Sequence, residues 1–131
     1  MNSKRYITEG ENLPKWTNPI SHAVVTNNMC FISGQLALNK EGEYVSGTVL
    51  EEAQLAFSNF FSVLKQSEFE KRDVVFIDIA FNDLKDLSIV NQLFKDLFPV
   101  GKLPARTIYQ AQALPYGGKI KVMGTAIKDL V

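Results

Sequence analysis

The chain has 131 residues, of which 46% are hydrophobic and 21% charged, a composition typical of one globular domain spanning residues 1–131. Its 14 basic and 14 acidic side chains cancel, and no basic run exceeds two residues, which argues against nucleic acid as a partner. No apolar run approaches the ~18 residues needed to span a membrane, and no signal-like segment follows the N-terminus, so we expect a cytoplasmic protein.

The N-terminal third of the chain predicts a strand and a hairpin. A short strand is expected at residues 6–8, and glycine, proline and asparagine then mark an irregular loop. Two β-prone runs at residues 21–26 and 29–35 flank Asn27-Asn28, a pair that tolerates the positive φ of a tight turn. These two runs should therefore pair as antiparallel neighbours.

The middle of the chain predicts a helix and a buried strand. Thr48 and Glu51 have the spacing of a capping box, and apolar residues then recur every three or four positions, which predicts a helix over residues 48–66. Residues 74–81 are apolar and rich in β-branched and aromatic side chains, with Asp78 as their only polar member. This composition predicts a central strand that is largely buried on both sides.

The C-terminal part predicts one more helix and two more strands. Apolar residues at helical spacing indicate a helix over residues 87–97, which ends before Pro99. Residues 105–112 and 119–128 have strand character and are separated by the turn-rich segment 114–118. The resulting order, β-β-β-α-β-α-β-β, is that of an α+β domain with a mainly antiparallel sheet.

Two helices can cover only one face of such a sheet. The strands carry Phe, Ile and Val that point both ways, so the second face must be buried elsewhere, and another copy of the chain is the ready solution. We therefore expect a homo-oligomer with ligand sites at the subunit boundaries, where concave pockets often form.

Arg106 is one of only three arginines and opens the predicted strand at residues 105–112. A guanidinium at the end of an apolar strand suits two parallel hydrogen bonds to a carboxylate, so a small organic acid is the first ligand to consider. The alternative is a surface arginine whose neighbours happen to be apolar.

Other kinds of site have little support in the sequence. It contains neither a G-x-G-x-x-G motif nor a P-loop, and one histidine and one cysteine, His22 and Cys30, cannot form a conventional zinc site. Cys30 lies in an apolar run and is expected to be a reduced, buried thiol. Ser21 and His22 are adjacent on a strand and point to opposite faces, so we expect His22 to be an ordinary hydrogen-bonded residue.

Five short blocks, spread along the chain from residue 18 to residue 115, follow one another in a distinctive order: Asn18-Pro19-Ile20-Ser21-His22-Ala23-Val24, Phe31-Ile32-Ser33-Gly34-Gln35, Val90-Asn91, Pro104-Ala105-Arg106-Thr107 and Leu114-Pro115. Together they resemble the landmarks of the YjgF/RidA (Rid) family of reactive-intermediate deaminases. The resemblance implies a chorismate-mutase-like α+β protomer with two helices on one face of a mixed sheet. It also implies a homotrimer with three clefts between subunits, and no cofactor or metal.

The resemblance assigns roles to several residues of this chain. In the clefts the family's arginine, here Arg106, binds the carboxylate of a 2-imino or 2-enamino acid, and water hydrolyses the C=N bond to a 2-keto acid and ammonia. Ser33 and Gly34 resemble the family's ligand-lining pair, and Asn91 matches its helix asparagine. Thr107 stands where a serine usually follows the arginine.

Four positions depart from the family pattern. Ile20 and His22 replace a tyrosine and a glutamine of one block, and Ile108 replaces a cysteine often found two residues beyond the arginine. Lys121 replaces the glutamate assigned to orienting the attacking water, and beyond Asp96 the only acidic residue is Asp129. Because an ammonium cannot accept a proton from water, we expect weak or absent deamination.

Two functions stay open on this evidence. One is an imine or enamine hydrolase with Arg106 as its anchor and the Gly34 backbone lining the site. The other is a module that binds small carboxylic acids and has lost the chemistry. Lys121 discriminates between them, either as a base in the cleft or as a side chain that points to solvent. The neutral charge argues against a third possibility, an endoribonuclease.

Overall fold

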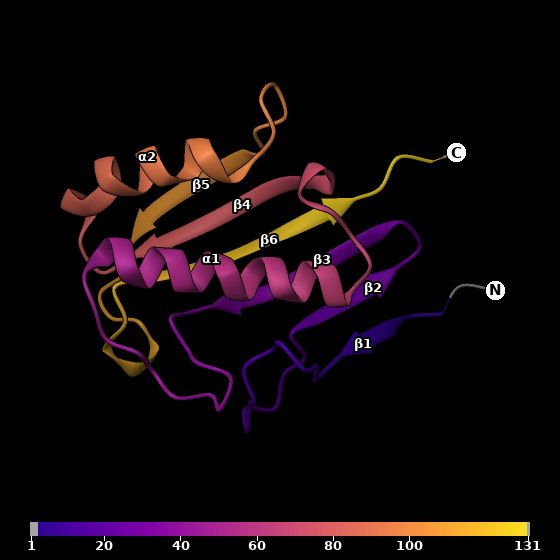
Figure 1. Cartoon of the computed structure of the whole chain (residues 1–131), viewed down its shortest axis with the longest axis horizontal. Coiled ribbons are helices and arrows are strands. Elements are labelled where there is room, and N and C mark those ends of the chain that lie inside the picture. The colour runs from indigo at the N-terminus through magenta and orange to yellow at the C-terminus, as the bar shows by residue number, and fades with distance from the viewer. Residues whose placement is uncertain (1–2, 131) are drawn as a thin grey trace.

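The computed structural model describes residues 3–130 as a six-stranded sheet with two α-helices on one face (Figure 1). The strands lie in the order β1-β2-β3-β6-β4-β5, and every neighbouring pair is antiparallel except β4 and β5, which are parallel. The succession of strands and helices along the chain is the predicted one, so the α+β fold class is confirmed.

The strands are β1 (Arg5–Ile7), β2 (Ala23–Thr26), β3 (Met29–Gln35), β4 (Val74–Phe81), β5 (Ala105–Gln110) and β6 (Ile120–Ile127), and the helices are α1 (Val49–Gln66) and α2 (Leu87–Leu97). Within residues 3–130 neither helix is long and apolar enough to cross a membrane. The same part of the chain contains no group of three or more His, Cys, Asp or Glu side chains that could hold a metal ion.

Local signals account for the hairpin and for the start of the first helix. Asn27 takes a φ of 52° in the turn between β2 and β3. At the start of α1 the Thr48 Oγ1 accepts a hydrogen bond from the Glu51 N–H at 3.1 Å, and the Glu51 carboxylate accepts one from the Thr48 N–H at 2.9 Å. The end of β5 was predicted two residues too late, because its partner β4 ends at Phe81, opposite Gln110.

The main hydrophobic core lies between the two helices and the sheet. Alternate residues of β4 and β6, among them Ile77, Ile79 and Val122, point into it and are fully buried. Helix α1 contributes Phe57 and Phe60, and the free thiol of Cys30 is buried in the same core, as predicted.

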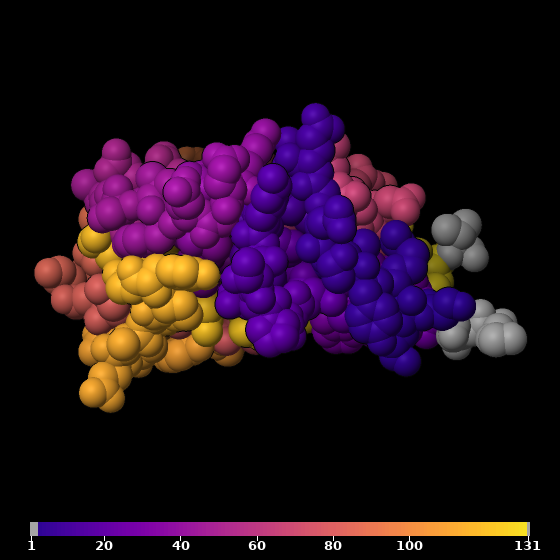
Figure 2. Space-filling model, turned by 90° about the horizontal axis from the view of Figure 1, so that it is seen from below, coloured from indigo at the N-terminus to yellow at the C-terminus, as the bar shows by residue number. Residues whose placement is uncertain are grey.

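A second, smaller cluster covers one end of the opposite face of the sheet, called the outer face below. Three connecting segments, 10–20, 36–48 and 111–118, converge there and lie side by side in Figure 2, where they are indigo, purple and yellow-orange. The cluster contains Leu36, Leu38, Ala80 and Leu114, with Trp16, Tyr44 and Ala111 packed against them.

The remainder of the outer face is uncovered and mainly apolar. Asp78 and Lys121 are the charged side chains on this face among the described strand residues. Five large side chains expose 37–61% of their surface there: Tyr6, Phe31, Tyr109, Met123 and Ile127. The chain therefore has the uncovered apolar face from which a homo-oligomer was predicted, and the homotrimer itself stays a prediction.

Candidate functional site

Arg106 lies on the helix-covered side of the sheet, at its β5 edge. In the parallel ladder it pairs with Ile77, whose side chain is buried in the main core, so both side chains project toward the helices. The guanidinium carbon lies 4.8 Å from the centre of the Phe94 ring on α2. This stacking supports the guanidinium plane and leaves its N–H groups available to an anion.

Arg106 and Asn91 line one pocket of about 630 Å³ beside α2. Within residues 3–130 the Asn91 Oδ1 is buried without a hydrogen-bond partner. Lys95 adds a second cation to the lining, and none of the described lining residues is acidic. The structure therefore brings together the predicted arginine and asparagine in a pocket whose charge suits a carboxylate.

The two residues that follow Arg106 point to different faces of the sheet. Ile108 pairs with Ile79 and packs against the main core, outside the lining of the Arg106 pocket. Thr107 points to the outer face, where its hydroxyl donates a hydrogen bond to the Asp78 carboxylate. The lone polar residue of β4 thus has a partner, and Thr107 is separated from the pocket by the sheet.

Lys121 lies on the outer face, opposite to Arg106. It pairs with Ala80, whose side chain belongs to the outer cluster. With Ile20 and Gly34 it lines a second pocket of about 200 Å³, whose remaining walls are largely apolar: Trp16, Asn18, Leu36, Leu38, Pro115 and Tyr116. In a single chain the two predicted cations therefore occupy separate pockets, and the predicted site is divided into two halves.

The Lys121 side chain crosses Gly34 of β3. A Cβ at Gly34 would lie 2.8 Å from the Lys121 Cδ and 3.1 Å from its Cγ, so a glycine leaves the room that this stem occupies. The adjacent Ser33 hydroxyl donates a hydrogen bond to the Ser21 carbonyl at 2.6 Å. The resemblance makes Gly34 part of a ligand-lining pair, and within the chain itself the structure places the Lys121 stem against this glycine, at an irregularity in the register of β3.

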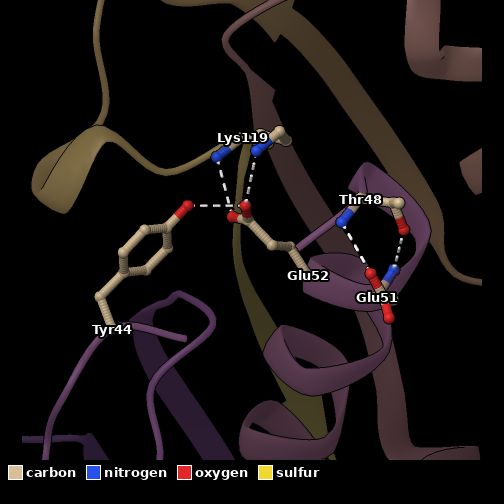
Figure 3. A network of polar contacts seen from close by, with 5 residues as sticks. All are labelled: Tyr44, Thr48, Glu51, Glu52 and Lys119. Carbon is tan, nitrogen blue, oxygen red and sulfur yellow. Dashed lines mark hydrogen bonds and ion pairs between the residues drawn. The ribbon is translucent and has the colours of Figure 1, made fainter. Parts of the chain in front are cut away.

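A buried carboxylate fixes the segment that leads into β6 (Figure 3). Glu52 of α1 is 1% exposed, and its Oε2 accepts hydrogen bonds from the Tyr44 hydroxyl at 2.6 Å and from the Lys119 Nζ at 3.2 Å. Its Oε1 accepts a third from the Lys119 backbone N–H at 3.0 Å. Burial by itself raises the pKa of Glu52, but these hydrogen bonds outweigh burial and lower it. The network ties α1 to the segment before Lys121.

His22 is fully buried and stacks on Trp16, with 3.7 Å between the ring centres. Its Nε2 donates a hydrogen bond to the Pro14 carbonyl at 2.8 Å, and its Nδ1 accepts one from the Gln35 amide at 3.3 Å. Burial lowers the pKa of His22, although the Pro14 hydrogen bond opposes it. His22 is thus the hydrogen-bonded residue that the sequence predicted, and it supports Trp16 in the wall of the Lys121 pocket.

Sequence reasoning missed Glu52, Phe94 and Tyr116 as parts of these sites. A signal for Glu52 was present, because it lies three residues after Val49 on the apolar stripe of the helix, where a charge requires partners. Phe94 is one of the apolar residues at helical spacing in segment 87–97, but its contact with Arg106 depends on how α2 crosses β5. Tyr116 lay in a segment recognised only as a turn.

Comparison with known proteins finds relatives over nearly the whole chain. The sequence model of the family described as Endoribonuclease L-PSP matches residues 10–128. A protein of the goat, Capra hircus, named 2-iminobutanoate/2-iminopropanoate deaminase, is 34% identical over 95% of this chain and 90% of its own. The human protein of the same name is 35% identical over 88% of this chain and 84% of its own. A RutC family protein of Leuconostoc mesenteroides subsp. cremoris is 34% identical over 88% of this chain and 92% of its own.

Solved structures have the same fold. A Rid-family protein of unknown function from Yersinia pestis superposes with a TM-score of 0.90 at 27% identity, covering 96% of this chain and 100% of its own. RidA from an Antarctic Psychrobacter bacterium superposes with a TM-score of 0.87 at 27% identity, covering 95% of this chain and 100% of its own. These likenesses agree with the fold that the five sequence blocks implied.

Proposed function

Because the chain belongs to the Endoribonuclease L-PSP family and has the fold of a Rid-family protein, we propose that it binds small 2-imino and 2-keto carboxylic acids with Arg106 as the carboxylate anchor. The observation that carries the proposal is the Arg106 pocket. Within residues 3–130 Arg106 forms no ion pair, and it shares the pocket with the unpartnered oxygen of Asn91. The names of the goat and human relatives support this class of substrate.

The proposal places the ligand in clefts between copies of the chain in a homotrimer. Two features support it: the outer face is apolar and uncovered, and the expected site residues fall into two pockets on opposite faces. A copy whose outer face packs beside the β5 edge of its neighbour would complete one site from Arg106 and Lys121. A cytoplasmic location is part of the proposal, and the free, buried Cys30 is compatible with a reducing compartment.

Hydrolysis of a bound 2-imino acid is slow in this proposal. Attack of water on the C=N carbon is assisted when a carboxylate accepts the proton of the water. Strand β6 has no acidic residue. The carboxylates beside it have other partners, since Glu52 binds Tyr44 and Lys119 while Asp78 accepts a hydrogen bond on the outer face. Within the described chain no carboxylate replaces the family glutamate.

A second candidate function is binding without turnover, in a trimer that senses a small acid or supports a partner enzyme. Lys121 favours it, because this side chain stands at the position of the family's water-orienting glutamate and lies in the pocket rather than in solvent. An ammonium there attracts a carboxylate but does not activate water.

Calorimetric titration with 2-oxobutyrate tests the anchor. Arg106→Lys loses one of two parallel hydrogen bonds to the carboxylate, each contributing about 1.5–3 kcal/mol, so binding should weaken by about 10- to 150-fold. Arg72→Lys is the matched control, since Arg72 is exposed and paired with Glu70. If wild type and Arg106→Lys form assemblies of the same mass in solution and bind 2-oxobutyrate equally well, Arg106 is not the carboxylate anchor.

One further measurement separates the two candidate functions, and another tests the assembly on which both depend. Release of 2-keto acid from freshly generated 2-iminobutyrate, above the rate without protein, supports the hydrolase, whereas tight binding without such release supports the binding module. Light scattering gives the mass in solution, and a monomer or a stable dimer at micromolar concentration would contradict the trimer and the clefts between subunits.

A further inference from the structure

The surroundings of Lys121 are unusual for a surface lysine. Its pocket of about 200 Å³ is walled mainly by aliphatic and aromatic side chains from the three segments of the outer cluster, with Trp16 and Tyr116 among them. None of the described lining residues is acidic. Lysine amines that form Schiff bases with carbonyl compounds in enzymes characteristically lie in such apolar pockets.

The direction of the Lys121 side chain keeps its amine away from carboxylates. Strand β6 lies between β3 and β4, and the stem of Lys121 leans over Gly34 of β3. Asp78 lies on the other side, on β4, and is bound by the Thr107 hydroxyl. Within residues 3–130 Lys121 forms neither an ion pair nor a side-chain hydrogen bond, so no partner holds its amine.

We propose that Lys121 is a nucleophile that forms a Schiff base with C2 of the 2-keto acid held by Arg106 of a neighbouring copy, an inference that rests on the proposed function. The neutral amine attacks C2, and the carbinolamine loses its oxygen as water after taking up a proton. The product is a protonated ketimine, with a C=N bond between C2 and the Lys121 nitrogen. One amine, one 2-keto acid and one proton thus give one ketimine and one water.

The same ketimine forms from a 2-imino acid. The neutral Lys121 amine attacks the C=N carbon of the protonated 2-imino acid, and one proton moves from the lysine nitrogen to the substrate nitrogen, which leaves as ammonia. The positive charge stays on the ketimine, and no oxidant or reductant is needed. Hydrolysis of the ketimine then returns the 2-keto acid and the protonated lysine. Because no described carboxylate assists that water, the ketimine should persist, as the slow hydrolysis proposed above also requires.

Reduction with cyanoborohydride tests the proposal, because it converts a ketimine into a stable secondary amine. Wild-type protein is incubated with 2-oxobutyrate and cyanoborohydride at pH 9, digested, and mapped by mass spectrometry. Label at Lys121 should exceed that at any other lysine by roughly tenfold or more, since its pocket concentrates the ligand. If all exposed lysines are labelled to the same extent, the proposal is overturned. This outcome is measured in the wild-type protein and needs no variant.

Variants locate the reaction. Lys121→Arg keeps the positive charge but cannot form a ketimine, so label at this position should vanish. Lys102→Arg, at an exposed lysine outside both pockets, should leave the label at Lys121 unchanged. Arg106→Lys should lower it. Co-expression of Arg106→Lys with Lys121→Arg should restore the label at Lys121 of the Arg106→Lys chain. In mixed assemblies this lysine can face the intact Arg106 of a Lys121→Arg chain.

Titration without the reductant separates failure of this proposal from failure of the proposed function. If wild type and Lys121→Arg both bind 2-oxobutyrate but wild type is not labelled at Lys121, the Schiff base is wrong and the carboxylate site stands. If wild type neither binds nor is labelled, both proposals fail.

Discussion

The buried carboxylate of Glu52 allows a direct test of how firmly α1 is tied to the segment before Lys121. Glu52→Gln keeps the shape of the side chain but removes its charge, which weakens the hydrogen bonds from Tyr44 and Lys119. Breaking a buried ion pair costs about 3–5 kcal/mol. Glutamine still accepts a hydrogen bond, and the Lys119 side chain is 35% exposed and regains water. The free energy of unfolding should therefore fall by about 2–3 kcal/mol at pH 7.

Urea unfolding at one fixed protein concentration measures this loss. Glu51→Gln is the matched control, because it makes the same chemical change one residue earlier. Glu51 is exposed, and glutamine also serves at the third position of a capping box, so its effect should stay below about 0.5 kcal/mol.

The stabilisation by the Glu52 carboxylate should depend on pH, and its direction follows from the lowered pKa of this group. The pKa of Glu52 is held below its ordinary value of 4.5, so the folded protein keeps this carboxylate ionised to lower pH than the unfolded chain does. Its stabilisation is complete above that ordinary value and is lost as the pH falls through the lowered pKa. The difference between wild type and Glu52→Gln should therefore shrink at acid pH. An undiminished difference there, or equal effects of Glu51→Gln and Glu52→Gln at neutral pH, would refute the reasoning.

Three further predictions concern glycines and Lys121. Gly42 and Gly101 have φ of +84° and +78°, but a Cβ at Gly42 would lie 2.0 Å from the Lys15 carbonyl oxygen while Gly101 has open space. In urea unfolding Gly42→Ala should cost roughly 3 kcal/mol or more and Gly101→Ala about 1 kcal/mol, and equal costs would contradict this. Gly34→Ala should reduce cyanoborohydride labelling at Lys121 while costing less than about 1 kcal/mol, since the flexible stem gives way; unchanged labelling would contradict it. Lys121→Glu should release 2-keto acid from 2-iminobutyrate faster than Lys121→Ala, because a carboxylate can accept the proton of water; equal rates would contradict it.

Secondary structure could be predicted where local signals and tertiary contacts agree. The capping box at Thr48 and the turn at Asn27 are local, and each is sufficient to place the start of an element. The strand order could not be predicted in the same way. The C-terminal strand β6 inserts between β3 and β4, and this placement depends on pairing between segments far apart in the sequence.

The candidate site shows what the sequence lacked. Arg106 and Lys121 were expected to share a cleft, and both pair with residues of β4, which serves as a common reference. Arg106 pairs with Ile77 and Lys121 with Ala80. These partners are three positions apart on one strand, an odd number, so the two cations must project from opposite faces of the sheet. Residue types and spacing identify both side chains, but only the register assigns their faces.

This division of the site makes assembly a condition for the proposed chemistry. A small acid held at the β5 edge by Arg106 lies across the sheet from the Lys121 of its own chain. It can meet a lysine amine at its C2 carbon only if another copy presents its outer face. The apolar surface of that face and the Lys121 pocket lie on the same side of the sheet. An association that buries the apolar surface therefore also brings the Lys121 pocket against the neighbouring copy. The uncovered face follows from a sheet with helices on one side only, whereas the divided site follows from the register of β5 and β6 on β4, and one association of copies would resolve both.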